Sequence, residues 1–185
     1  MKRIILVGKA ASGKDHARKL LSLNGANYAI SYTTRPPRED ETEGIDYYFI
    51  SPDEFEYMIS KDKMYEYVEF NGWYYGTSNK QMDECDLFIM TPLGLSHLSK
   101  EDRANSYVVY FDIPEDIRKT RMLERKGNAD SVERRIEADE LDFKDFINYD
   151  YKINDPNYSD EDVNMLYINL FLINKKKISK TLKLY

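Results

Sequence analysis

The feature that most constrains this chain is a glycine-bearing loop near its N-terminus. Residues 4–7 read Ile-Ile-Leu-Val, which is typical of a buried parallel strand, and residues 14–23 have helical character. Between them, residues 8–14 read GKAASGK and fit the pattern G-x-x-x-x-G-K. In this setting small residues let backbone N–H groups curl around a phosphate, and the helix N-terminus adds partial positive charge. The sequence therefore predicts a phosphate-binding loop rather than an ordinary glycine turn, made of Gly8, Lys9, Ala10, Ala11, Ser12, Gly13 and Lys14.

The residue after Lys14 departs from that pattern. Such loops carry Ser or Thr there, and its hydroxyl ligates Mg²⁺, whereas this chain has Asp15. A carboxylate is also a hard oxygen ligand, so Asp15 can hold Mg²⁺ directly or through water. An acid at a helix start is also stabilised by the helix dipole without any metal, and both interpretations stay open.

Composition excludes several classes of protein. The 185 residues carry 27 Lys and Arg against 33 Asp and Glu, so an acidic single domain is expected and sequence-independent binding of nucleic acid is not. One cysteine, Cys85, excludes an intramolecular disulfide and fits a reducing compartment. No stretch approaches the ~20 apolar residues that span a membrane. We expect a cytoplasmic protein, monomeric or homodimeric, with no nucleic-acid or membrane partner.

The order of elements predicts the fold class. Strands are expected at residues 28–34, 47–50, 65–70, 73–75, 87–90, 108–111 and 151–153, and helices at 51–60 and 131–146 and after 78, 114 and 159. Strands that alternate with helices predict a parallel sheet covered on both faces. The stretch from residue 35 to residue 77 breaks the alternation and reads as an insert. Such sheets bind ligands beyond the carboxyl ends of their strands, where the glycine loop lies.

A second set of motifs lies in and around the insert. Residues 31–38 read SYTTRPPR, where consecutive prolines separate Arg35 from Arg38 in a rigid anion clamp. Residues 44–49 read GIDYYF, Glu66 follows, and residues 74–78 read YYGTS. In this order and spacing, and together with the glycine loop, these motifs resemble the guanylate kinase family over almost the whole chain.

The resemblance implies a fold and an activity. The fold is the α/β P-loop NTPase fold, a parallel sheet flanked by helices, with a mixed α/β acceptor-binding insert and a helical lid. It implies one domain, with a core of residues 1–31, 80–120 and 140–185, an insert of residues 32–79 and a lid at about 121–139. The implied activity is ATP-dependent phosphorylation of GMP and dGMP, with Mg²⁺.

The resemblance also assigns roles residue by residue. Glu66 makes chemical sense in its role, because a carboxylate can accept from guanine N1–H and the 2-amino group together. Arginines beside the transferring phosphoryl group would stabilise its charge. The implied catalytic residues are Lys14, Arg35, Arg121, Arg125 and Arg135, and the implied ATP contacts beyond the loop are Asp15, His16 and Asn154. The implied ligands of the acceptor phosphate are Arg35, Arg38, Tyr47 and Tyr75. The implied guanine contacts are Ser31, Glu66, Thr77 and, by position, Thr91.

One stretch departs from the family. Where its central strand ends in D-x-D-x-x-G, this chain has Ile89 and Thr91 in place of both acids. That substitution leaves guanine selectivity and metal ligation open. Three alternatives therefore remain beside a guanylate kinase: a broader deoxynucleoside monophosphate kinase or a kinase of another phosphorylated sugar, a non-catalytic guanylate-kinase-like binding module, and a regulatory P-loop ATPase. The intact Lys14 and the arginine clamp argue against the last two.

Overall fold

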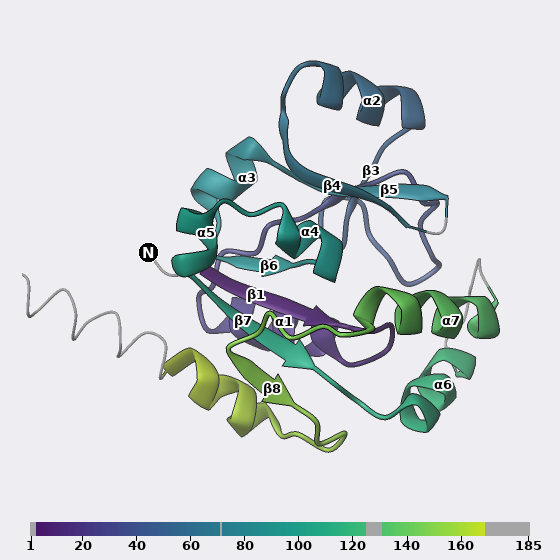
Figure 1. The fold of residues 1–185 in the computed structure, drawn as a ribbon, viewed down its shortest axis with the longest axis vertical. Coiled ribbons are helices and arrows are strands. Elements are labelled where there is room, and N and C mark those ends of the chain that lie inside the picture. Colours follow the sequence, from purple (N-terminus) through teal and green to yellow (C-terminus); the bar gives the residue numbers. More distant parts are fainter. Residues whose placement is uncertain (1–2, 71, 125–130, 169–185) are drawn as a thin grey trace, which may run out of the picture.

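Two sheets organise the chain in the computed structural model, which describes residues 3–70, 72–124 and 131–168 (Figure 1). The first sheet contains β1 (Arg3–Gly8), β6 (Leu87–Ile89), β7 (Ser106–Phe111) and β8 (Tyr151–Ile153). Its order is β6-β1-β7-β8, and every pairing is parallel. The predicted parallel sheet is therefore confirmed.

The alternation of side chains along β1 buries both faces of this sheet. Ile4 and Leu6 pack on one face with α1 (Lys14–Leu23) and with Val163. Ile5 and Val7 pack on the other face, in a cluster that includes Met82, Leu95 and Phe143 from three helices. A strand buried on both faces has no polar positions, which is why residues 4–7 are continuously apolar.

The second sheet is built by the insert. It contains β2 (Tyr32–Thr33), β3 (Tyr48–Phe49), β4 (Met64–Phe70) and β5 (Trp73–Ser78) in the order β3-β2-β5-β4. β2 and β3 pair in parallel, whereas the other pairs are antiparallel, so the sheet is mixed. The predicted hairpin of β4 and β5 is present, although Asn71 of its turn lies outside the described residues.

The helix α2 (Pro52–Ser60) covers this second sheet (Figure 1). It starts with a capping box in which Ser51 and Glu54 bond each other's backbone N–H groups, as the sequence predicts. Phe55 is fully buried and stacks on Tyr74 of β5 with ring centroids 5.1 Å apart. This contact fixes the helix to the sheet.

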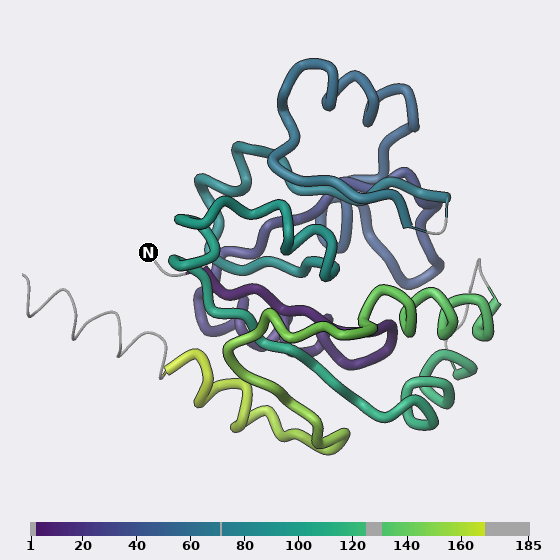
Figure 2. The backbone as a smooth tube through the Cα atoms, viewed as in Figure 1, coloured from purple at the N-terminus to yellow at the C-terminus, as the bar shows by residue number. Residues whose placement is uncertain are grey.

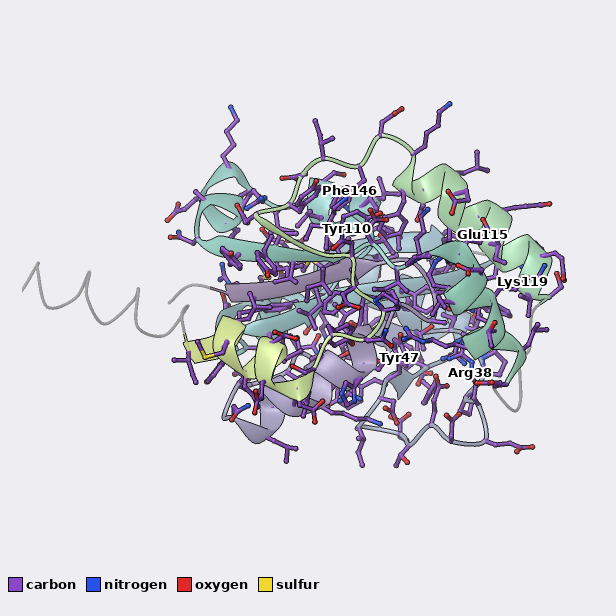
Figure 3. All side chains as sticks on the ribbon, turned by 90° about the horizontal axis from the view of Figure 1, so that it is seen from below. Arg38, Tyr47, Tyr110, Glu115, Lys119 and Phe146 are labelled. Atoms are coloured by element: carbon purple, nitrogen blue, oxygen red, sulfur yellow. The ribbon has the colours of Figure 1, made fainter. Side chains whose placement is uncertain are left out.

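The largest differences from the prediction concern residues 28–34 and the end of α7. Residues 28–34 do not form one strand, because Tyr28 bridges Leu87 of the first sheet whereas β2 belongs to the second. The helix expected to run to residue 146 is α7 (Val132–Phe143), which ends at Phe143. The turn after it brings Phe146 against Tyr110 of β7, with ring centroids 5.1 Å apart (Figure 3). The chain must leave the helix to make this core contact.

The remaining helices complete the layers. They are α3 (Asn79–Glu84), α4 (Pro92–Ser96), α5 (Lys100–Ala104), α6 (Glu115–Leu123) and a helical stretch over residues 160–168. The sequence analysis did not predict α4 or α5. Helices α6 and α7 lie together beyond the arrowhead of β1, at the end where the glycine loop begins (Figure 1). None of the helices in the described ranges is long and apolar enough to cross a membrane.

Candidate active site

Residues 8–14, here called the P-loop, have a shape that requires glycine at both ends. A Cβ at Gly8 would lie 2.8 Å from the carbonyl oxygen of Phe111. Gly13 has φ +94°, and a Cβ there would collide with the hydroxyl of Tyr158, which donates to the Gly13 carbonyl at 2.9 Å. Glycine is therefore needed for close packing at one end and for a left-handed backbone at the other.

The ammonium of Lys14 lies inside the curl of this loop. Its Nζ donates to the carbonyl oxygens of Gly8 at 2.5 Å and Lys9 at 2.9 Å. Helix α1 starts at Lys14, and its N-cap residue, Gly13, provides no side-chain cap. The first turn of a helix has N–H groups with no partner inside the helix, so a lysine and a helix start converge here as in an anion-binding site.

Two hollows meet at Lys14, which lines both. The first, called the P-loop hollow, is lined by residues of the P-loop and of α1, and by Arg121, Pro156 and Tyr158. The second, called the insert cleft, lies between the P-loop, the second sheet and α7. A group held by Lys14 can therefore be reached from either hollow.

The P-loop hollow contains most of the residues expected to contact ATP. Arg121 donates to the carbonyl oxygens of Ala11 at 3.2 Å and Pro156 at 2.9 Å. His16 lines the hollow, and its Nε2 lies 2.8 Å from the carboxylate of Asp160. Asn154 is exposed just after β8 and is not among the residues that line the hollow.

Glu66 is the buried acid of the insert cleft. It is 6% exposed, and its Oε1 accepts from the Thr77 hydroxyl at 2.7 Å. Burial raises the pKa of Glu66 to about 7, although hydrogen bonds from the hydroxyl and the backbone of Thr77 oppose the shift. A Cβ at Gly94 would lie 2.7 Å from Oε2, so a glycine leaves room for this carboxylate.

The other expected base contacts lie around Glu66 in different ways. Ser31 and Thr91 line the insert cleft, as does Ile89. Thr77 is buried and meets the cleft through its bond to Glu66, rather than as part of the lining. The hydroxyl oxygen of Thr91 accepts from the Gly94 N–H at 3.0 Å and so caps α4.

The arginine clamp is assembled around an acid that the sequence analysis did not single out. The guanidinium of Arg35 bonds both oxygens of Glu41, at 2.7 and 2.8 Å, and Arg38 bonds the same carboxylate at 2.9 Å. The spacing of three residues from Arg35 to Arg38 to Glu41 was the available signal. Arg35 also lies 5.5 Å from the centre of the Tyr47 ring. One carboxylate therefore holds both arginines together, and neither arginine is among the residues that line the insert cleft.

Tyr47 and Tyr75 form the wall of the insert cleft next to the clamp. Both line the cleft, and their ring centroids are 6.1 Å apart in an edge-on arrangement. Burial raises the pKa of Tyr47 well above its ordinary value, and the nearby carboxylate of Asp15 adds to the shift. Tyr47 therefore keeps its proton and can donate a hydrogen bond to an anion.

Helix α7 brings one expected arginine and two unexpected acids to the cleft. Arg135, Asp139 and Asp142 all line it, whereas Arg125 lies outside the described residues. Burial raises the pKa of Asp139, and the N–H of Ala10 and the charge of Lys14 oppose the shift. The one available signal for Asp139 was its spacing of four residues from Arg135, which places both on one helix face.

Asp15 follows Lys14 and lines one of the two hollows. It lines the P-loop hollow, its side chain is 62% exposed, and its charge also acts on Tyr47 of the insert. Its carboxylate lies 3.8 Å from Arg18 Nε. Within the described ranges no group of three or more His, Cys, Asp or Glu side chains could enclose a metal ion. A metal bound here would rely on one protein carboxylate together with ligand oxygens.

Comparisons with known proteins identify the family of this chain. A family model described as "Guanylate kinase" matches residues 1–167. A guanylate kinase from Enterococcus faecalis is 36% identical over 161 residues, which cover 81% of this chain and 78% of the relative. One from Geobacter metallireducens is 37% identical over 141 residues, covering 71% and 68%. The crystal structure of a guanylate kinase from Anaplasma phagocytophilum superimposes with a TM-score of 0.66 at 18% identity, covering 95% of this chain and 86% of that one. This chain belongs to the guanylate kinase family.

Proposed function

We propose that this chain transfers the γ-phosphoryl group of ATP to GMP and dGMP, forming ADP and the nucleoside diphosphate. The observation that carries the proposal is the position of Lys14, which lines both the P-loop hollow and the insert cleft. A donor phosphate in the first hollow and an acceptor phosphate in the second would meet at this ammonium. Family membership supports the choice of ATP and GMP.

Different parts of the chain bind the donor and the acceptor. The P-loop and the start of α1 hold the ATP phosphates, with Arg121 beside them. The cleft holds the acceptor: its base faces Glu66, and its phosphate meets Tyr47, Tyr75 and the clamp, whose arginines turn from Glu41 to the phosphate. Arg135 reaches the transferring group from α7. Such transfer relies on positioning and electrostatics, so no strong base is required.

We also propose that the chain consists of a core, an acceptor-binding insert and a lid. The core comprises residues 1–31, 80–120 and 140–185, the insert comprises residues 32–79, and the lid comprises about residues 121–139. The second sheet is built from residues 32–78, which supports the boundaries of the insert. We place the enzyme in the cytoplasm as a monomer or a homodimer; the single cysteine supports a reducing compartment.

Asp15 fits a magnesium ion bound mainly by phosphates. Mg²⁺ usually keeps several waters and is held by one or two carboxylates together with substrate phosphates, rather than by a cage of protein ligands. Asp15 offers one exposed carboxylate at the start of α1, next to Lys14, which fits this mode of Mg²⁺ coordination. When bound, the ion would neutralise charge on the ATP phosphates.

The metal role of Asp15 predicts an altered response to Mg²⁺. Asp15→Asn should raise the Mg²⁺ concentration needed for half-maximal activity by about 3–10-fold, because an amide oxygen lacks the negative charge that attracts the ion. Asp15→Thr, which restores a hydroxyl, should support activity at lower Mg²⁺ than the wild type. Titrations of Mg²⁺ at fixed ATP check this. Superimposable curves for the three proteins would reduce Asp15 to an acid that stabilises the helix start.

The base site predicts tolerance of a purine that lacks the 2-amino group. A carboxylate that accepts from this amino group forms a charge-assisted bond, and Thr91 offers a neutral oxygen that already caps α4. The expected loss is about 1–2 kcal/mol, or roughly 5–30-fold in discrimination between GMP and IMP. Thr91→Asp should restore this discrimination and keep the cap, since Asp caps helices as well as Thr does. The ratio of kcat/KM for GMP and IMP is the measurement; an unchanged ratio in Thr91→Asp would refute this role.

A single assay separates the proposal from its closest alternatives. ADP formation from ATP is followed with and without GMP. We expect turnover that depends on GMP and stops when GMP is consumed. Release of ADP without GMP would indicate an ATPase, and no turnover with or without GMP would refute the proposed transfer and favour a binding module.

A further inference from the structure

Two neighbouring acids of α7 are bonded to the P-loop, and the proposed transfer does not use them. Asp139 is 5% exposed, and its Oδ2 accepts from the backbone N–H of Ala10 at 2.7 Å. Glu140 Oε1 lies 2.5 Å from the ammonium of Lys9. Figure 2 shows the green α7 directly beside the purple turn that follows β1. The helix therefore contacts two consecutive residues of the loop by polar bonds.

Both acids are joined to one buried arginine of α6. Arg118 is 1% exposed and is the largest fully buried side chain of the described residues. Its guanidinium lies 3.3 Å from Asp139 Oδ2 and 3.2 Å from Glu140 Oε1, and its Nε donates to the Ile113 carbonyl at 3.1 Å. A buried charge is tolerated only when it is paired, so removing one partner is far more damaging than removing both. Helices α6 and α7 and the P-loop thus share one network.

A second arginine of α6 holds the next residue of the loop. The Ala11 carbonyl accepts from Arg121 of α6 at 3.2 Å, and Ala11 has φ +58°, a left-handed conformation that is uncommon for a residue with a Cβ. Residues 9, 10 and 11 are each held by a side chain of α6 or α7. Their backbone conformation is therefore set by the two helices as well as by the loop sequence.

We propose that Asp139 is a positioning residue, which locks α7 to the P-loop so that Arg135 enters the insert cleft beside Lys14. Arg135 lies one turn before Asp139 on the same face of α7, and both line the cleft with Ala10 and Lys14. The bond from Ala10 to Asp139 fixes the rotation and the height of the helix relative to the loop. A displacement of about 1 Å in such a site can lower a rate by ~10²-fold. This inference rests on the proposed phosphoryl transfer.

The test separates positioning from stability. Asp139→Ala removes the buried one of the two carboxylates that pair with Arg118 and leaves only Glu140, so it should lower both the melting temperature and kcat. The double variant Arg118→Met/Asp139→Ala removes both charges and should recover most of the melting temperature. Its kcat should stay at least ~10-fold below the wild type, with KM for GMP within about 3-fold, because the insert is untouched. Leu141→Ala, an exposed position on α7, serves as the control. Recovery of kcat together with the melting temperature would overturn the proposal and leave Asp139 a purely structural residue.

A second measurement tests whether Asp139 acts through Arg135. Arg135→Ala should lower kcat at least ~10-fold in the wild type and less than about 3-fold in the double variant, where Arg135 is already displaced. An equal fall in kcat on Arg135→Ala in the wild type and in the double variant would contradict the proposal. Hydrogen exchange of the P-loop amides, measured without nucleotide, should be faster in the double variant than in Leu141→Ala. Faster exchange in a protein that shows no GMP kinase activity would refute the proposed function while supporting the lock, and unchanged exchange would refute the lock.

Discussion

Lys14→Ala should lower kcat for phosphoryl transfer to GMP by at least ~10²-fold while the protein stays folded. The ammonium lies in the curl of the P-loop, bonded to the carbonyls of Gly8 and Lys9, at the junction of the two hollows. Its removal takes away a charge that faces the transferring phosphoryl group and leaves the apolar core intact. Steady-state kinetics with ATP and GMP, together with a thermal melt, measure both parts of this expectation.

Lys19→Ala is the matched control for this variant. Lys19 is another lysine of α1 but is exposed, so the same substitution there should leave kcat within about 2-fold of the wild type. A Lys14→Ala protein with unchanged kcat would show that the P-loop does not hold the transferring phosphates. A loss of the same size in Lys19→Ala would point to damage to the helix instead.

Glu66→Gln should lower kcat/KM for GMP by ~10²-fold, the second large effect. The carboxylate can accept from two guanine donors, and each charge-assisted bond is worth about 1.5–3 kcal/mol. Glutamine keeps the shape but offers one acceptor and a repelling amide N–H₂. Glu69→Gln, at an exposed position of the same strand, is the control and should stay close to the wild type. If kcat/KM for GMP in Glu66→Gln equals that of the wild type, the guanine base does not bind at Glu66.

The same residue predicts the pH dependence of acceptor use. Burial raises the pKa of Glu66 to about 7 in the free protein. Below that pH the neutral acid cannot accept from both guanine donors, so kcat/KM for GMP should rise from pH 6 to pH 8. The phosphate of GMP also titrates, near pH 6, and this contributes equally to the pH profiles of the wild type and of Glu66→Gln. The rise in kcat/KM should therefore be smaller for Glu66→Gln than for the wild type. Parallel profiles for the two proteins would contradict the assignment.

The parts of the fold set by local sequence could be predicted from it. The apolar run at residues 4–7, the loop of residues 8–14 and the capping box of α2 each act within a few residues, and each is present as expected. The division of residues 28–34 between two sheets could not be predicted, because Tyr28 pairs with the first sheet and β2 with the second. The end of α7 at Phe143 likewise depends on a tertiary contact, since Phe146 packs on Tyr110 of a distant strand.

The site divides in the same way. Glu66, Tyr47 and Lys14 lie in motifs whose neighbours indicate their chemistry, and the structure brings all three to one cleft. Tyr158 lies in no such motif, and the spacing of Asp139 from Arg135 gives its helix face but not its contact with the P-loop. They reach the P-loop from 145 and 129 residues away, where Tyr158 bonds the carbonyl of Gly13 and Asp139 bonds the N–H of Ala10. Contacts of this kind follow from the packing of helices against the loop, which a single sequence does not display.

The central claim is best tested by a comparison of acceptors. With ATP and Mg²⁺ held constant, kcat/KM is measured for GMP, dGMP, IMP, AMP, dTMP and ribose 5-phosphate. GMP and dGMP should be the best acceptors, and IMP should follow. AMP should be far behind, because the carboxylate of Glu66 would face a lone pair at adenine N1. A higher kcat/KM for dTMP, AMP or the sugar phosphate than for GMP would contradict the assignment of this chain as a guanylate kinase.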